Sequence, residues 1–316
     1  MPFGPAKASQ PWPTTATSSG LPLSVTLPVS REMMLSPGVE NATAAQISSG
    51  VGQITDPVSG ITTFRTIVTL GNPALQPQKA KAYNFGFTVN PLESTSVSVD
   101  YWDYKYDNRI QTQNAQAVIN ADPNGPSVIR DSNGTAQTII TRTFNAPSGT
   151  RTSGVDFAAS FNTPLLGGQI VFRNALSYLL KYDIDTGSGI YDGVGRRNAA
   201  TTSPATAAAA PRIRNILSGD WARGGQSVNV SWRYSSSVDD DYALAITATP
   251  SPDIAAWSAV DWQYRLRFGA DGSYEAALGM INAFDKAPGT ARFTGYLPTV
   301  ADALGRQTYV RLGVRF

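Results

Sequence analysis

The most informative stretch of the chain is its C-terminal end, Gly305-Arg306-Gln307-Thr308-Tyr309-Val310-Arg311-Leu312-Gly313-Val314-Arg315-Phe316. Side chains in an extended strand point alternately to its two faces. One face of this strand is therefore apolar, and it carries Thr308, Val310, Leu312, Val314 and Phe316. The other face carries a tyrosine and two arginines. The pattern fits the last strand of a soluble sheet, and it fits equally the closing strand of an outer-membrane β-barrel, with lipid outside and a polar lumen inside.

Composition favours the barrel over a helical membrane protein. Charged residues make up 15% of the 316 residues, yet the mean hydropathy is only −0.17. No run of about 18 apolar residues occurs, so the sequence predicts no transmembrane helix. The apolar residues are instead dispersed by alternation, as expected of a wall with lipid on one side and water on the other.

The chain contains no cysteine and no histidine. Disulfides, thiolate or imidazole metal ligands and any catalytic arrangement built on histidine are therefore excluded. No other catalytic constellation is found, so we expect neither an enzyme nor a bound metal or cofactor. The Asp239-Asp240-Asp241 run lacks the spaced ligands of a calcium-binding loop and is interpreted as a solvated loop. A net charge of +2 gives no broad attraction to nucleic acid.

Alternation recurs in segment after segment along the chain, within residues 83–89, 97–106, 155–161, 170–182, 212–221, 228–234, 260–268 and 274–280. The phase slips near Trp102, which predicts a bulge there. The connections alternate in length. The short ones are Asn90–Glu93, Thr163–Gly168, Ala222–Gly225 and Gly269–Gly272, and the long loops cover about 108–134, 183–210, 235–255 and 282–304.

This alternation of loop length predicts that every short turn lies at the end of the sheet where Phe316 lies. Transmembrane barrels sort their connections in this way, with short turns on the periplasmic side, whereas a soluble sandwich has no reason to do so. The predicted fold is all-β, an antiparallel up-and-down meander of a transmembrane β-barrel.

Five segments resemble, in order, sequence elements of one known family: Leu70–Phe87, Val97–Ile110, Thr152–Phe157, Gly279–Lys286 and Leu304–Phe316. The first contains Asn72-Pro73-Ala74-Leu75-Gln76-Pro77, followed by Gln78 where the family usually has glutamate. The family is that of the TonB-dependent outer-membrane receptors, and the resemblance covers about residues 50–316. Family members carry a signal peptide, a TonB box, an N-terminal plug domain and a barrel of about twenty-two strands.

The resemblance implies that residues 50–316 are the C-terminal part of such a barrel, about nine or ten strands, with the plug domain absent. Residues 1–49 are expected to be a poorly ordered or non-native segment and a loop. The implied function is energy-coupled uptake of a scarce nutrient across the outer membrane of a Gram-negative bacterium, with an iron–siderophore complex, cobalamin or an oligosaccharide as ligand. A passive porin or a structural barrel is the alternative, and a soluble β-sandwich binding module is a third class.

The two faces of the sheet receive separate predictions. The outward face should carry Phe85, Phe87, Phe172, Leu176, Val230, Trp232, Trp262, Leu266, Leu312 and Val314. The lumen face should carry Arg173, Lys181, Arg233, Arg265, Arg267, Arg311 and Arg315. These cations either pair with carboxylates such as Asp156, Asp261 and Glu275 or form a basic surface for an anionic ligand.

The resemblance also names partners. These are outer-membrane lipid, the nutrient, the TonB system acting through a plug domain, and the barrel-assembly machinery, which in this family reads the closing strand. Strand addition at an exposed edge would read alternate side chains, here Tyr309, Leu312, Val314 and Phe316. Deleting Phe316 should then slow membrane insertion in the cell sharply while changing refolding in detergent little.

Overall fold

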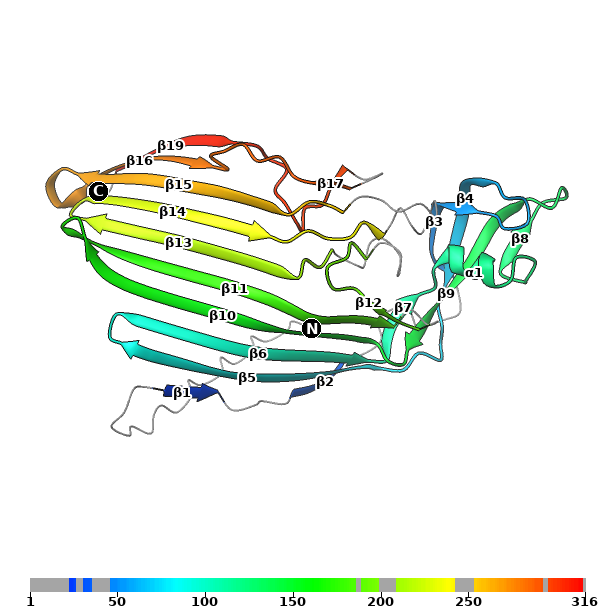
Figure 1. Ribbon diagram of the computed structural model, residues 1–316. Coiled ribbons are helices and arrows are strands. Elements are labelled where there is room, and N and C mark those ends of the chain that lie inside the picture. The colour runs from blue at the N-terminus through cyan, green and yellow to red at the C-terminus, as the bar shows by residue number, and fades with distance from the viewer. Residues whose placement is uncertain are drawn as a thin grey trace, which may run out of the picture.

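The computed structural model describes residues 23–26, 31–35, 46–185, 189–198, 209–241, 253–291 and 295–314. Most of them form one long sheet, which we call the wall (Figure 1). Its nine successive strands are β5 (Gln78–Leu92), β6 (Thr95–Asp107), β10 (Thr150–Leu165), β11 (Gly168–Asp185), β13 (Ile213–Arg223), β14 (Gln226–Ser235), β15 (Trp257–Phe268), β16 (Tyr274–Ile281) and β19 (Gln307–Val314). Each strand pairs antiparallel with the next, which confirms the predicted meander.

The four short turns lie at one end of the wall, where β19 also ends (Figure 1). One of the two-residue turns joins β10 to β11 through Leu166 and Gly167, which have φ of 52° and 72°. Two successive residues with positive φ are typical of a type I′ turn, whose twist matches that of the paired strands. The short helical turn η2 (Ala270–Gly272) joins β15 to β16. The topological prediction is confirmed for the turns, while Arg315 and Phe316 lie outside the described residues.

Cross-strand register confirms the assignment of side chains to two faces. Directly opposed residues share a face, and Val230 is opposite both Gly219 and Trp262. All ten residues predicted to face outward lie on this outer face by the same pairing. A recess on the opposite face extends across five neighbouring strands, from Thr88 to Ser218. The wall is therefore concave on that side, which we call the lumen face.

Two details of register differ from the sequence prediction. The bulge lies in β11 rather than near Trp102, because Gly154 is opposite Leu179 while Ser153 is opposite Lys181. Leu180 is the extra residue, and Lys181 is thereby moved to the outer face. β6 stays in register through Trp102 because its partner, Gly154, has no side chain; a Cβ there would lie 2.5 Å from the indole ring.

A second, smaller sheet lies beyond the end of the wall opposite the short turns (Figure 1). This unit, which we call the module, comprises β3 (Gln46–Thr55), β4 (Thr62–Leu70), β7 (Arg109–Thr112), α1 (Ala115–Ala121), β8 (Val128–Arg130) and β9 (Ala136–Ala146). The segment 108–134, predicted as a long loop, does belong to the long connection between β6 and β10, but it contains β7, α1 and β8. The module joins two connections that are distant in sequence, because β4 pairs in parallel with β9. A core that includes Ile54, Ile119 and Ile139 holds α1 against the sheet.

A buried ion pair ties the module's turns together. Arg130 donates to both carboxylate oxygens of Asp56, at 2.7 and 2.8 Å, and also to the carbonyl oxygens of Pro123 and Gly134. The Asp56 side chain has no exposed surface. The hydrogen bonds from Arg130 hold the pKa of Asp56 well below its usual range, against the opposing effect of burial.

Short strands complete the described residues. β1 (Leu23–Thr26) and β2 (Arg31–Leu35) pair with the edge of β5, so part of the segment 1–49 is extended backbone in the wall sheet. The rest of that segment before residue 46 lies outside the described residues. β12 (Ile190–Asp192) pairs with β11, and β17 (Thr290–Ala291) pairs with β18 (Gly295–Tyr296). No helix among the described residues is long and apolar enough to cross a membrane.

Candidate functional site

The lumen face carries a series of ion pairs. Arg173 lies 2.5 Å from Asp220, and Arg233 contacts both oxygens of Asp261 at 2.7 and 3.0 Å. Glu275 accepts hydrogen bonds from Arg267 at 3.1 Å and Arg311 at 2.7 Å. Four of the predicted lumen cations are thus matched with carboxylates, including two of the three acidic partners named from the sequence.

The remaining predicted cations have different surroundings. Arg265 shares the lumen face and donates from Nε to the hydroxyl of Ser227 at 3.1 Å. Lys181 does not share this face, because the β11 bulge turns it outward toward Asp183, 3.9 Å away. Arg315 lies outside the described residues. The structure therefore brings Arg173, Arg233, Arg265, Arg267 and Arg311 together, and it separates Lys181 from them.

A transverse row of side chains crosses the lumen face near its loop end. The row is defined by register across five strands, Asp156 opposite Ser177, Ser177 opposite Arg214, Arg214 opposite Ser235, and Ser235 opposite Trp257. These five residues line one recess of about 640 Å³. Because the row follows the pairing of rigid strands, the backbone fixes the order and spacing of its chemical groups.

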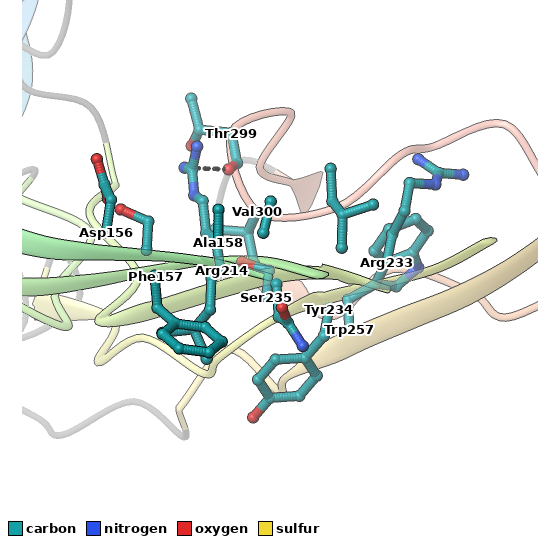
Figure 2. A pocket seen from close by; sticks show the side chains of 15 residues that line it. Asp156, Phe157, Ala158, Arg214, Arg233, Tyr234, Ser235, Trp257, Thr299 and Val300 are labelled. Carbon is teal, nitrogen blue, oxygen red and sulfur yellow. Dashed lines mark hydrogen bonds between the residues drawn. The ribbon is translucent and has the colours of Figure 1, made fainter. Parts of the chain in front are cut away.

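The segment Leu297–Ala303, which we call the strap, passes over this recess. Arg214 points toward it and donates from Nη2 to the carbonyl oxygen of Thr299 at 2.7 Å (Figure 2). Phe157 and Tyr234 point to the opposite side of the sheet in the same view. The buried strap residue Val300 packs in an apolar cluster with Val238 and Ile254. The strap is thereby attached to the ends of two other long loops.

Trp257 forms the end of the row. Its side chain is buried, and its indole N–H donates to the carbonyl oxygen of Lys286 at 3.2 Å. The guanidinium carbon of Arg233 lies 5.1 Å from the centroid of the indole, a cation–π arrangement. Ala301 of the strap packs in the same small cluster as Trp257. The tryptophan is thus an ordered wall of the recess rather than a mobile surface ring.

Sequence reasoning missed Arg214, Ser235 and Trp257. Arg214 lies in a segment whose alternation is weak, since Asn215 takes an outward position and Ile216 a lumen position. The sequence prediction places Ser235 in the loop 235–255 and begins the next strand only at residue 260, whereas Ser235 ends β14 and Trp257 begins β15. The signal that could have identified them is the run of register partners beginning at Asp156, which requires the pairing of all five strands.

A second polar cluster occupies the long loops outside the wall. Tyr191 donates a hydrogen bond to Asp241, and the guanidinium of Arg196 lies 5.1 Å from the tyrosine ring. Burial, together with that carboxylate, raises the pKa of Tyr191 to about 12. Asp240 is buried and contacts Arg197 at 2.8 Å. The interpretation of Asp239–Asp241 as a solvated run is therefore wrong for two of its three carboxylates.

The chemistry of the lumen face is that of binding. Ion pairs, hydroxyls and an indole can orient a polar ligand, and a guanidinium in a recess offers a fixed fork of N–H donors. Among the described residues, no group of three or more acidic, histidine or cysteine side chains could hold a metal ion.

Comparisons with known proteins agree with this architecture. The sequence model of the TonB-dependent receptor-like β-barrel matches residues 37–283. A search of the curated proteins finds no match.

Among solved structures, a mutant of the ferric enterobactin receptor PfeA from Pseudomonas aeruginosa superposes with a TM-score of 0.60 at 15% identity, over 92% of this chain and 38% of that one. The siderophore receptor PirA from Acinetobacter baumannii gives 0.59 at 14% identity, over 93% and 39%. The outer-membrane transporter YddB from Escherichia coli gives 0.51 at 14% identity, over 79% and 34%. The chain therefore spans about two fifths of the length of the first two receptors, and the likeness shows a shared fold.

Proposed function

Because this chain belongs to the TonB-dependent receptor-like β-barrel family, we propose that it forms part of the wall of a receptor-type transporter in the outer membrane of a Gram-negative bacterium. The transporter takes up a scarce nutrient with energy delivered by the TonB system through a plug domain. The family match over residues 37–283 carries the proposal. The apolar outer face and the polar, concave lumen face support it.

Most of the predicted lumen cations have a structural role in this proposal. Arg173, Arg233, Arg267 and Arg311 have carboxylate partners, so we propose that they maintain a hydrated lumen. Ligand recognition is assigned to the recess beneath the strap, where Arg214 has no carboxylate partner among the described residues; Arg233 also lines this recess but is paired with Asp261. The family resemblance implies an iron–siderophore complex, cobalamin or an oligosaccharide as the nutrient, and the lining of the recess adds a short peptide or peptide-like nutrient to these classes. The end of β19 is proposed as the segment that the barrel-assembly machinery reads.

The test is uptake by a strain deleted for the gene that encodes this chain, compared with its parent. Labelled ferric siderophores, cobalamin, oligosaccharides and dipeptides are offered with and without a protonophore. We expect uptake of one class to require both the gene and the energised inner membrane. Uptake that requires the gene but persists with the protonophore would identify a passive porin and contradict the proposal.

A further inference from the structure

The row beneath the strap has an acidic end. Asp156 is opposite Asp100 on the neighbouring strand, and the carboxylate of Asp100 lies over Gly86, where a Cβ would fall 1.9 Å from its oxygen. Neither carboxylate has an ion-pair partner among the described residues. Two like charges on adjacent strands repel each other, so this end of the row favours a cation.

The other end of the row offers donors for an anion. Arg214 has a carbonyl oxygen as its hydrogen-bond partner and no carboxylate among the described residues. Beside it in the row, Ser235 is 6% exposed, and its buried Oγ has no hydrogen-bond partner in the described part of the chain. A buried hydroxyl without a partner requires an explanation, and a ligand oxygen held between Ser235 and Arg214 supplies one.

The spacing of the two ends fits one ligand. Neighbouring strands lie about 4.8 Å apart, so Asp156 and Arg214, two strands apart, are separated by about 10 Å at the backbone. Both side chains line the same recess, so a ligand need not reach either backbone. An extended dipeptide spans about 7 Å. The recess also has an apolar lining, provided by Ala175, Ile216 and Val300, which suits the side chains of such a ligand.

We propose that this row binds the zwitterionic backbone of a short peptide or peptide-like ligand. The ammonium group lies at Asp156 and Asp100, and the carboxylate lies at Arg214 and Ser235. An anion without an ammonium group would occupy Arg214 while facing two uncompensated carboxylates. The inference rests on the proposed function, since it names the chemical class that the transporter recognises.

The test uses the receptor extracted in detergent from its own outer membrane. The probes are alanyl-phenylalanine, its C-terminal amide and its N-acetyl derivative, with affinity measured by isothermal titration calorimetry. We expect the free dipeptide to bind at least about ten-fold more tightly than either blocked form, since a lost charge-assisted contact costs about 1.4 kcal/mol or more.

Three variants assign the two ends. Arg214→Gln should weaken the dipeptide at least ten-fold and abolish discrimination against the amide, while discrimination against the N-acetyl form remains. Asp156→Asn should also weaken the dipeptide at least ten-fold, but it should abolish discrimination against the N-acetyl form and keep discrimination against the amide. Arg265→Gln removes a charge from the same face outside the recess. It should change neither the affinity for the free dipeptide nor the discrimination against its two blocked forms. Heat-modifiable electrophoretic mobility reports whether each variant is folded.

Equal binding of the dipeptide and its amide, equal binding of the dipeptide and its N-acetyl form, or no binding of any probe would each overturn the inference. Failure of the proposed function is recognised separately, by nutrient uptake that is insensitive to the protonophore. A receptor with energy-dependent uptake that binds no dipeptide would leave the proposed function standing and remove only the zwitterion site.

Discussion

The wall and the module place their apolar side chains in opposite environments. In the wall, Leu312 and Phe85 are 78% and 50% exposed, whereas Ile119 and Ile139 in the module are fully buried. The module therefore contains its own core and can be stable in water. The wall has little core of its own among the described residues, and its exposed outer face needs an apolar phase, which the proposed function supplies as lipid. The same chain thus combines two solutions to burying apolar surface.

Ion pairs show the same contrast. In the module, the Asp56 carboxylate is completely buried and the Arg130 side chain is 14% exposed. In the wall, the side chains of Arg173 and Asp220 are 55% and 41% exposed. A buried pair cannot lose one partner without leaving a charge that is poorly solvated, while an exposed pair is already solvated and screened. Substitutions in the two regions should therefore differ in size and in their response to the medium.

The largest effect is expected in the module core. Ile139→Ala removes a fully buried side chain and should lower the free energy of unfolding of the module by about 2–5 kcal/mol. Hydrogen exchange followed by mass spectrometry should show faster exchange in β4, β8 and β9 and unchanged protection in β13 and β14. Equal loss of protection in both regions would show that the module is not an independent cooperative unit.

A charge on the outer face should have the next largest effect, and only in lipid. Leu312→Arg should lower the stability of the complete barrel by about 2–4 kcal/mol if the residue lies near the bilayer midplane. Gln263→Arg, which adds the same charge on the lumen face, is the matched control and should have little effect. Urea unfolding in lipid vesicles measures both. If the two variants unfold at the same urea concentration, the assignment of faces is wrong.

Lowering the pH should remove the contribution of the buried Asp56–Arg130 pair to the stability of the module. The folded pKa of Asp56 is depressed, so its contribution to stability is fully present above the unfolded pKa of about 3.9. That contribution is lost progressively as the pH falls from there toward the folded pKa. We expect the stability difference between the wild type and Asp56→Asn, read from exchange in β3 and β4, to be constant from pH 7 to 5 and to shrink below about pH 4. A difference that shrinks already between pH 7 and 5 would contradict the assigned pair.

The wall could be predicted from the sequence because the patterns that specify it are local and recur in every strand and connection. Alternation with period two and the alternation of loop length fix the strand order and, by register, the direction of residues such as Phe172 and Trp262. A single bulge was enough to reverse Lys181, because the displaced residue, Leu180, is apolar and continues the apparent pattern. Local rules therefore predict the wall except where an extra residue shifts the phase.

The module and the recess depend on contacts that no local pattern contains. β4 and β9 pair in parallel although about 70 residues separate them, for example at Val68 and Ile140. The recess likewise unites Asp156 with Trp257 only after five strands have paired. Each of these residues is ordinary in its own segment. These residues form a site only once the strands have paired. The sequence therefore predicted the basic face and missed Arg214.

The smallest effect is expected for an exposed ion pair of the wall. Arg173→Gln removes the partner of Asp220, but Asp220 also accepts a hydrogen bond from Asn229 at 2.6 Å, and water reaches both side chains. The loss should be at most about 1 kcal/mol, and it should vanish in 1 M salt, where the screening length is about 3 Å. Urea midpoints in vesicles at low and high salt measure this directly. A loss as large as that of Leu312→Arg, or one unaffected by salt, would mean that the lumen side of the wall is as dry as the module core, and the contrast between the two regions would no longer hold.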